Sequence, residues 1–247
     1  MKKYVNLFVF VFMIGACLSQ GRAQTKSAVS YKNPVVDIAM PDPTVIKAAD
    51  GYFYVYATES TRNVPIMKSK DLVEWTYCNT AFTNKTRPRF EPKAGIWAPD
   101  INYINGKYVL YYAMSVWGGE QTCGIGVATA NSPQGPFTDH GKMFRSNEIG
   151  VQNSIDPSLL QYEGRNYLVW GSFRGIYVIE LTADGLSIMP GAKKKRIAGT
   201  AFEAVYIHKH DDYYYMFASI GSCCQGVKST YKVVVGRSKK VWGPYKD

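Results

Sequence analysis

Four stretches of the chain repeat one pattern of hydrophobic and polar positions. Each begins with an acidic residue, continues as a short apolar run, breaks at a polar or glycine-containing pair and returns as a strongly aromatic run. Pairs such as Asp50-Gly51 and Asn105-Gly106 are hairpin turn signals, so each stretch predicts two antiparallel strands. The four stretches are PDPTVIKAADGYFYVYAT from Pro41, PDINYINGKYVLYYAMS from Pro99, IDPSLLQYEGRNYLVWGS from Ile155 and FEAVYIHKHDDYYYMFAS from Phe202.

The acids that open these stretches recur at the interval of a repeat unit. Asp42, Asp100, Asp156 and Glu203 are separated by 58, 56 and 47 residues. A further strand, polar turn and aromatic return follow three of the hairpins, and a shorter outer half follows the third. A period of about fifty residues, with hardly any helical periodicity, predicts an all-β propeller of four-stranded blades. Because the innermost strands of a propeller surround one axis, we expect the four acids to meet in one pocket.

Clustered carboxylates favour hydrolysis of glycosidic bonds over the other chemistries considered. Proximity and burial raise the pKa of at least one carboxyl, which provides a protonated acid beside an ionised base. Calcium binding is the competing use, but no D-x-D-x-D-G loop is present. The three histidines, His140, His208 and His210, fall in predicted outer or turn positions and so do not favour a zinc hydrolase, and no serine-triad or phosphate-loop signature occurs. We therefore predict no metal site and no required cofactor. For Asp100, capping of a turn is favoured over a role in the pocket.

Composition and charge are those of a soluble globular protein. Of the 247 residues 46% are hydrophobic and 19% charged, and the aromatic share of 14% suits both strand packing and stacking on sugars. The formal charge of +10 raises nucleic acid as a partner, but the basic residues form no stripe. The one dense run, Lys193–Arg196, is predicted to be a solvated loop. We therefore expect a carbohydrate partner, no nucleic acid and a monomer.

The N-terminus predicts export. Two lysines precede the apolar run from Leu7 to Ile14, which is too short to span a membrane but suits a signal peptide. Cleavage after Ala23 would leave residues 24–247 as the mature domain. The stretch IGAC resembles a bacterial lipobox, in which Cys17 would carry a lipid anchor, and both alternatives remain open. Either one predicts a bacterial protein of the periplasm, the cell surface or the extracellular space.

Export also permits disulfide bonds. Cys223 and Cys224 are adjacent, and neighbouring Cα atoms lie about 3.8 Å apart, below the usual disulfide range of roughly 4.4–6.8 Å. A bond between them would be strained and would stiffen a loop. Two small buried residues are the alternative, and the sequence leaves the choice open.

The ordered set MPDPTV, WAPDI, NSIDPSLL, GSF and FEA resembles glycoside hydrolase family 43, the five-bladed propeller glycosidases. The resemblance runs from about Asp37 to Asp247 and implies hydrolysis with inversion of configuration. It implies that Asp42 is the general base and Glu203 the general acid, while Asp156 orients the acid and adjusts its pKa. The sucrose- and fructan-cleaving propellers are similar but retain configuration and carry an ECP-type acid motif, where this chain has FEA.

Within that family, the tail FASIGSCCQGVKSTYKVVVGRSKKVWGPYKD is similar to the endo-acting arabinanases, which cut α-1,5-linked arabinan. Exo-acting α-L-arabinofuranosidases and β-xylosidases of the same family are one alternative, and a non-catalytic carbohydrate-binding propeller is another. We expect Trp97 to offer an aromatic wall to the sugar and Phe173 to be a weaker stacking surface. Asn153 and Ser172 are predicted to hydrogen-bond sugar hydroxyls.

The chain ends at the close of its fourth repeat, whereas the resemblance implies five blades. A fifth blade would need about fifty further residues, and in this family it should carry a histidine that helps to hold a central metal ion, often calcium. We therefore expect a propeller that is incomplete at its C-terminus, with about four blades, and structural calcium only in the full-length parent.

Overall fold

The computed structural model describes residues 30–246. All of its helices and strands lie in one compact unit, Asn33–Asp247. The predicted leader, residues 1–23 with Cys17 and both candidate cleavage sites, lies outside the described residues. None of the helices in the described range is long and apolar enough to cross a membrane.

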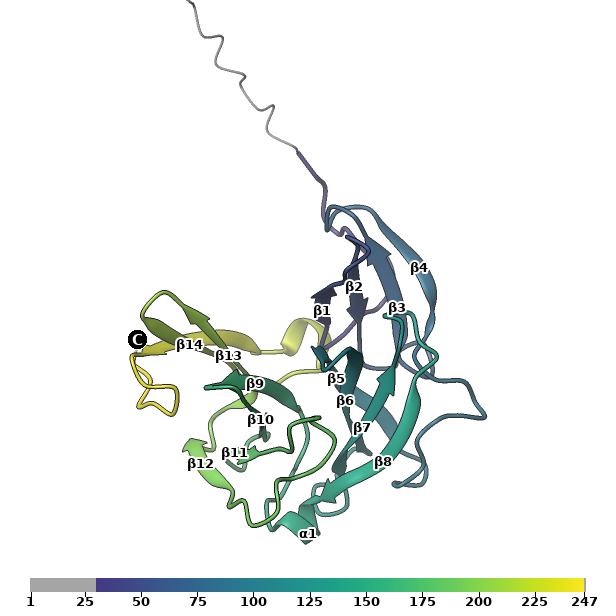
Figure 1. The fold of residues 1–247 in the computed structure, drawn as a ribbon. Helices are drawn as coiled ribbons and strands as arrows, with labels where there is room; N and C mark the ends of the chain where they lie inside the picture. Colours follow the sequence, from purple (N-terminus) through teal and green to yellow (C-terminus); the bar gives the residue numbers. More distant parts are fainter. Residues whose placement is uncertain (1–29, 247) are drawn as a thin grey trace, which may run out of the picture. The chain divides into compact units, whose positions relative to one another are not determined.

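Four antiparallel sheets follow one another along this unit, and each is built from consecutive strands that pair in chain order (Figure 1). Blade 1 contains β1 (Thr44–Lys47), β2 (Phe53–Tyr56), β3 (Pro65–Ser69) and β4 (Trp75–Thr80), and blade 2 contains β5 (Gly95–Ile104), β6 (Lys107–Ser115), β7 (Gly124–Ala130) and β8 (Thr138–Arg145). Blade 3 contains β9 (Ser158–Tyr162), β10 (Arg165–Trp170), β11 (Ile176–Glu180) and β12 (Lys195–Ala198), and blade 4 contains β13 (Glu203–His210), β14 (Tyr213–Ile220) and β15 (Lys232–Ser238). Two short helices, α1 (Ser146–Ile149) and η1 (Gly226–Lys228), lie in connections. The predicted all-β propeller is confirmed.

The predicted hairpins are confirmed at their turns. Asn105-Gly106 joins β5 to β6 with φ values of 48° and 81°, and Ile104 pairs with Lys107 across it. Such left-handed residues in a two-residue turn match the twist of the two flanking strands. Glu163-Gly164 joins β9 to β10 in the same way, with φ values of 50° and 72°. The polar pairs in the sequence therefore define the first two strands of each blade.

Two outer strands differ from the prediction. Lys195 and Arg196, expected in a solvated loop, begin β12, the outermost strand of blade 3. Both side chains are exposed, and charges are compatible with such a strand because its outer edge is unpaired and faces solvent. In blade 4 the predicted return strand after β15 is reduced, within residues 30–246, to a single bridge between Arg237 and Lys246.

The first strands of successive blades are neighbours. Strand β1 contacts β5, β5 contacts β9, and β9 contacts β13. Strands β2, β6, β10 and β14 each pair antiparallel with the first strand of their blade. The beginning of each first strand therefore lies beside the end of the second strand, at one common end of the blades.

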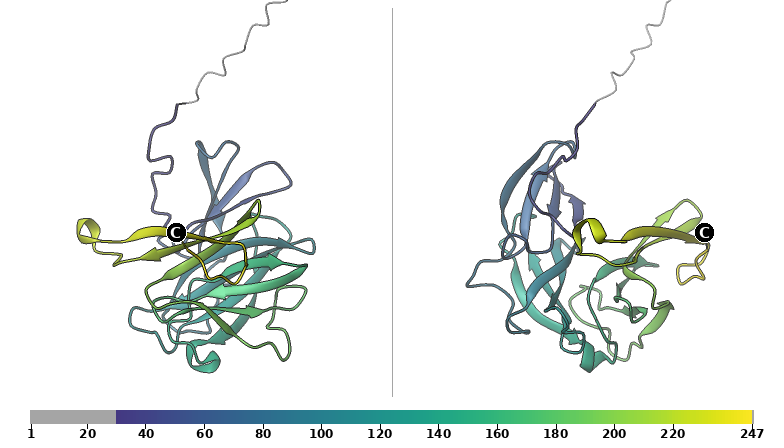
Figure 2. Two further views of the ribbon diagram at one scale, coloured as in Figure 1. Left: turned by 90° about the vertical axis from the view of Figure 1, so that its left-hand side faces the viewer. Right: turned by 180° about the vertical axis from the view of Figure 1, so that it is seen from behind.

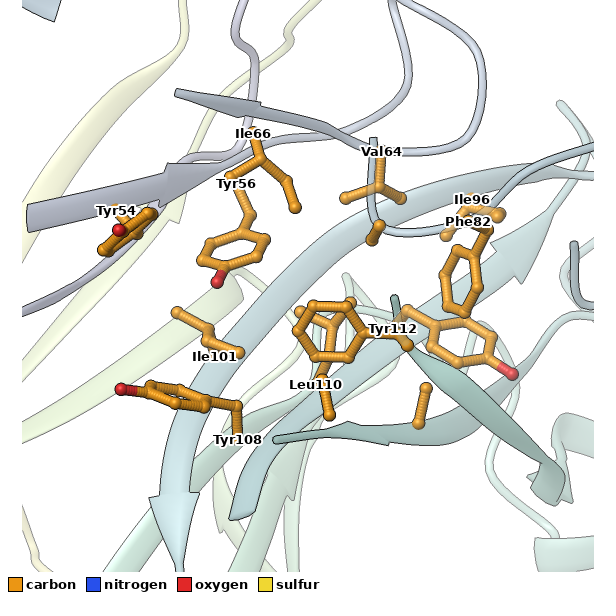
Figure 3. Close-up of a cluster of buried hydrophobic side chains, with 14 of the residues drawn as sticks. Tyr54, Tyr56, Val64, Ile66, Phe82, Ile96, Ile101, Tyr108, Leu110 and Tyr112 are labelled. Carbon is orange, nitrogen blue, oxygen red and sulfur yellow. The ribbon is translucent and has the colours of Figure 1, made fainter. Parts of the chain in front are cut away.

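The core lies between adjacent blades. One cluster joins blades 1 and 2, a second joins blades 2 and 3, and a third joins blades 3 and 4. Figure 3 shows the first, in which Tyr56 of blade 1 lies near Ile101 of blade 2, and Phe82, which follows β4, lies near Tyr112 of blade 2. Tyr56, Leu110 and Tyr112 are fully buried. The aromatic second strands are therefore the packing surfaces between blades, and they fix the first strands in place.

Candidate active site

A cavity of about 1060 Å³ lies at the common end of the blades where the first strands begin. It is lined by residues from all four blades. Every residue that the sequence analysis assigned to the site lines it, namely Asp42, Trp97, Asn153, Asp156, Ser172, Phe173 and Glu203, and Asp100 lines it as well. The predicted convergence of acids on one pocket is therefore confirmed.

The four acids do not occupy equivalent positions. Each blade has one residue with left-handed backbone where its first strand begins, namely Asp42, Ala98, Asp156 and Ala204, with φ values of 49°, 40°, 58° and 52°. Relative to that residue, Glu203 comes one position earlier and Asp100 two positions later. The strand register shifts beside Ala98 and beside Ala204. In blades 2 and 4 an alanine thus holds the left-handed position, the pairing beside it is irregular, and the acid lies elsewhere along the strand.

The carboxylate of Asp42 is exposed to the cavity and is held by Thr58. The Thr58 hydroxyl donates a hydrogen bond of 2.5 Å to Oδ2 of Asp42, and the Thr58 amide donates to the carbonyl of Pro41 at 2.9 Å. The hydroxyl in turn accepts a hydrogen bond from the amide of Ala98 at 2.7 Å. Thr58 thus ties the carboxylate of blade 1 to blade 2, while leaving it open to water.

Glu203 is the buried acid of the cavity, with only 9% of its surface exposed. The hydroxyl of Ser172 donates to its Oε2 at 2.6 Å, and Asn153 Nδ2 donates to the Ser172 oxygen at 2.9 Å. The phenol of Tyr231 lies near the same carboxyl, and burial together with the proximity and charge of Glu203 raises the pKa of Tyr231. Since Ser172 is committed to Glu203, its direct contact with a sugar stays a prediction.

Asp156 lies within the electric field of the other two acids. Burial, followed by the negative charges of Glu203 and Asp42, raises its pKa well above the usual range for an aspartate. The backbone amide of Ala204, near its carboxylate, opposes this shift. Asp156 is therefore the carboxyl that couples electrostatically to the two others.

Asp100 is a buried cross-link between blades and does not cap a turn. Its Oδ2 accepts from the amide of Leu159 at 2.7 Å and from the side chain of Asn102 at 2.7 Å. Its Oδ1 lies 3.5 Å from the donor hydroxyl of Thr44. Burial raises the pKa of Asp100 to about 6. Because Thr44 and Leu159 follow Asp42 and Asp156 by two and three residues, Asp100 fixes the strands that carry both.

The aromatic lining begins at Trp97 and continues to Trp117. Their ring centroids lie 5.6 Å apart, and Trp117 is 78% exposed. Gly95 makes room for the Trp97 ring, since a Cβ atom at Gly95 would lie 2.3 Å from Trp97 Nε1. Phe173 is half-buried and follows Ser172 directly. These rings give the cavity flat apolar surfaces, and stacking of Trp97 and Phe173 on a sugar stays a prediction.

Sequence reasoning named Ser172 but missed that every blade makes the same contribution to the cavity. A small hydroxyl residue stands at the end of each second strand, in the contexts YAT, YAMS, WGS and FAS. All four line the cavity, namely Thr58, Ser115, Ser172 and Ser219. The sequence contains this signal, because the hydroxyl recurs at one position of the repeat.

Cys223 and Cys224 form a disulfide bond, with their Cα atoms 3.8 Å apart. Neither is buried: Cys223 is half-buried and Cys224 is exposed, so the alternative of two small buried residues is wrong. Both line the cavity. The two other cysteines of the described range, Cys78 and Cys123, are free thiols.

The calcium ion that the family resemblance implies has no ligand set in residues 30–246. In that range no group of three or more His, Cys, Asp or Glu side chains is placed to hold a metal ion. His208 and His210 lie on β13 with exposed side chains. No step of the chemistry below is therefore derived through a metal.

Comparison with known proteins agrees with this geometry. The model of the family "Glycosyl hydrolases family 43" matches residues 31–247. An extracellular endo-α-(1→5)-L-arabinanase 1 of Bacillus subtilis is 38% identical over 83% of this chain and 67% of its own length. An extracellular exo-α-(1→5)-L-arabinofuranosidase of Cellvibrio japonicus is 35% identical over 83% of this chain and 66% of its own. The chain thus spans about two thirds of the length of these relatives.

Solved structures give the same result. The structure of an α-L-arabinanase of Cellvibrio cellulosa in complex with arabinohexaose superposes with a TM-score of 0.75 at 31% identity, over 85% of this chain and 74% of that one. The native arabinanase Arb43A of Bacillus subtilis superposes with a TM-score of 0.73 at 34% identity, over 85% and 76%. With a matching family model, matching relatives and a matching propeller, the chain belongs to glycosyl hydrolase family 43 and is classed among the glycoside hydrolases.

Proposed function

We propose that this chain is an inverting glycoside hydrolase that cleaves α-1,5-linked arabinan. The proposal rests on one observation: three carboxyl groups in different environments line the same cavity. Asp42 is exposed, Glu203 is buried, and Asp156 is coupled to both by charge. Glycosidic cleavage needs this division of roles between carboxyl groups.

In the proposed reaction Asp42 takes a proton from a water molecule, whose oxygen attacks the anomeric carbon. Glu203 donates its proton to the glycosidic oxygen as the bond to that carbon breaks. Attack opposite the leaving group inverts the configuration, and the two carboxyl groups must lie roughly 6.5–9.5 Å apart to leave room for the water. Asp156 orients Glu203 and adjusts its pKa.

The substrate class is inferred from the relatives. Those named above act, by their names, on α-(1→5)-linked L-arabinose, and one solved relative holds arabinohexaose. Endo action is favoured, because the relative with 38% identity is named an endo-arabinanase. Exo action is the second candidate, because the relative with 35% identity is named an exo-acting enzyme. The lengths of the products of debranched arabinan distinguish the two.

Export is part of the proposal. Two of the relatives are named extracellular, and the N-terminal sequence predicts a leader. A polysaccharide substrate outside the cell fits both observations. The mass of the mature N-terminus would separate cleavage after Ala23 from lipid attachment at Cys17.

The test is Glu203→Gln, assayed on debranched arabinan. Loss of the general acid should lower kcat by about 10²–10⁴-fold, while binding of arabino-oligosaccharides is kept. Glu163→Gln, in the exposed turn between β9 and β10, is the matched control and should keep full activity. An unchanged rate for Glu203→Gln would refute Glu203 as the general acid, and NMR of the first product would show its anomeric configuration.

A further inference from the structure

A second cavity of about 460 Å³ adjoins the catalytic cavity. Four of its seven lining residues also line the catalytic cavity, namely Trp117, Phe173, Cys223 and Cys224. The remaining three are Gly221, Ser222 and Gln225. The two spaces are therefore parts of one continuous cleft, and the shared residues form the boundary between them.

The four shared residues come from equivalent connections of three blades. Trp117 follows the second strand of blade 2, Phe173 follows that of blade 3, and the Cys223–Cys224 disulfide follows that of blade 4. Figure 2 shows the connection from β14 to β15, which carries the disulfide, extending beyond the other blades at one end. Each of these three blades thus adds one apolar group at the same end of the propeller, next to the carboxylates.

This boundary is apolar, neutral and open to solvent. No charged side chain lines the second cavity. Trp117 is 78% exposed although its ring lies beside that of Trp97, and Cys224 is exposed as well, so neither group belongs to the buried core. A disulfide is a small apolar surface, and a large exposed ring beside it is unfavourable in water unless a ligand covers it.

Polar groups stand at the edge of the same cavity. The amide Nε2 of Gln225 donates to the hydroxyl of Ser222 at 2.9 Å, which orients both side chains. An apolar floor with a few neutral hydrogen-bonding groups at its edge suits a neutral sugar ring, which has apolar faces and a rim of hydroxyls. An acidic sugar or a phosphate would find no cation there.

We propose that Trp117, Phe173 and the Cys223–Cys224 disulfide form a platform that binds a neutral sugar unit of the substrate chain beyond the catalytic carboxylates. The proposal rests on the proposed function, because it assigns one further unit of the same arabinan chain to the second cavity. The platform gives affinity for longer chains, and the intact disulfide is part of its surface.

The test compares kcat/KM for linear α-1,5-arabino-oligosaccharides of increasing length. Trp117→Ala and the double variant Cys223→Ala/Cys224→Ala should each lose about tenfold on the long oligosaccharides, equal to about 1.4 kcal/mol. Their losses should be smallest on the shortest oligosaccharide that is cleaved, because a short chain does not reach the second cavity. Tyr77→Ala and Cys78→Ala, both on β4 of blade 1 and outside either cavity, are the matched controls.

A measurement on the unaltered chain avoids the folding defects that a substitution can cause. Reduction of the folded chain by a phosphine and water, which yields two thiols and the phosphine oxide, should reproduce the length-dependent loss of the double variant. Equal losses at every length, or no loss on long chains, would overturn the platform and leave the hydrolase standing. If the unaltered chain cleaves no arabino-oligosaccharide, the proposed function fails, and this inference fails with it.

Discussion

Ser172 and Glu203 are paired twice, by a 2.6 Å hydrogen bond from the Ser172 hydroxyl to Oε2 of Glu203 and by a backbone bridge. The bridge joins the end of the second strand of blade 3 to the beginning of the first strand of blade 4. Asn153 donates to the Ser172 oxygen and completes the chain of contacts. The orientation of the proposed acid is thus set by the neighbouring blade.

Ser172→Ala should lower kcat by about tenfold or more, because a buried hydrogen bond to a group that becomes charged contributes about 1.5–3 kcal/mol. KM should change little, since the hydroxyl is occupied by Glu203. Steady-state kinetics on arabinan measures both constants. Ser238→Ala, at the end of β15, is the control, and Ser172→Thr should recover part of the rate. A rise in KM with unchanged kcat would instead assign Ser172 to sugar binding.

Asp156→Asn should alter the pH profile as well as the rate. The pKa of Asp156 is raised by burial and by the charges of Glu203 and Asp42, so the three carboxyls interact. Because the raised pKa keeps Asp156 protonated beside its ionised neighbours, Asp156→Asn removes a group that titrates at higher pH. The limb of the pH–rate profile that Asp156 contributes should therefore disappear. A profile that keeps its shape, with only kcat reduced, would show that Asp156 acts by position alone.

Asp100 should make the protein less stable as the pH rises. Its folded pKa of about 6 lies above the ordinary value of 3.8, so the folded state holds the proton more tightly than the unfolded state. This contribution is fully present below pH 4 and is lost as the pH rises through 6. It amounts to about 2–3 kcal/mol at most.

Asp100→Asn removes that group and should flatten the dependence of unfolding free energy on pH between 4 and 6. Urea unfolding at several pH values measures the slope. Asp50→Asn, in the exposed turn after β1, keeps the buried acid and should retain the slope of the unaltered chain. Equal slopes for Asp100→Asn and the unaltered chain would contradict the assignment.

Glu59→Gln should destabilise the fold. Glu59 pairs with Arg87, both side chains are buried, and its carboxylate also accepts from the amides of Asn63 and Ile96. Burial alone would raise the pKa of Glu59, but these partners outweigh it and lower the pKa. Leaving the Arg87 cation unpaired should cost about 3–5 kcal/mol. Thermal unfolding measures the loss of stability. Glu180→Gln is the control, because Glu180 pairs with Arg165 in a more exposed ion pair.

The blades, and the convergence of the acids on one cavity, could be predicted from the sequence. Turns such as Asn105-Gly106 set the hairpins, because their backbone conformation matches the strand twist. The acids recur at the blade interval, so their convergence followed from the symmetry of a propeller. Thr58, which has the same position in its blade as Ser172, was missed. Its role depends on a contact with Asp42 between the two ends of the β1–β2 hairpin.

The local geometry could not be predicted in the same way. The shift of Glu203 and Asp100 from equivalent positions accompanies irregular pairing in β13 and β5, which the spacing of acids does not encode. The strand at Lys195 was missed because only its last two residues, Ile197 and Ala198, are partly buried, so the strand carries no alternating pattern. The disulfide was left open because adjacent cysteines have no sequence signal for their oxidation state.

The position of the core between blades also bears on how the protein folds. Hairpins form from neighbouring residues and can form early, but each buries its aromatic face only when the next blade packs against it. Asp42, Asp156 and Glu203 come from three different blades, so they meet only after successive blades have docked. Recovery of catalysis during refolding should therefore lag behind recovery of β-structure and report the completion of assembly.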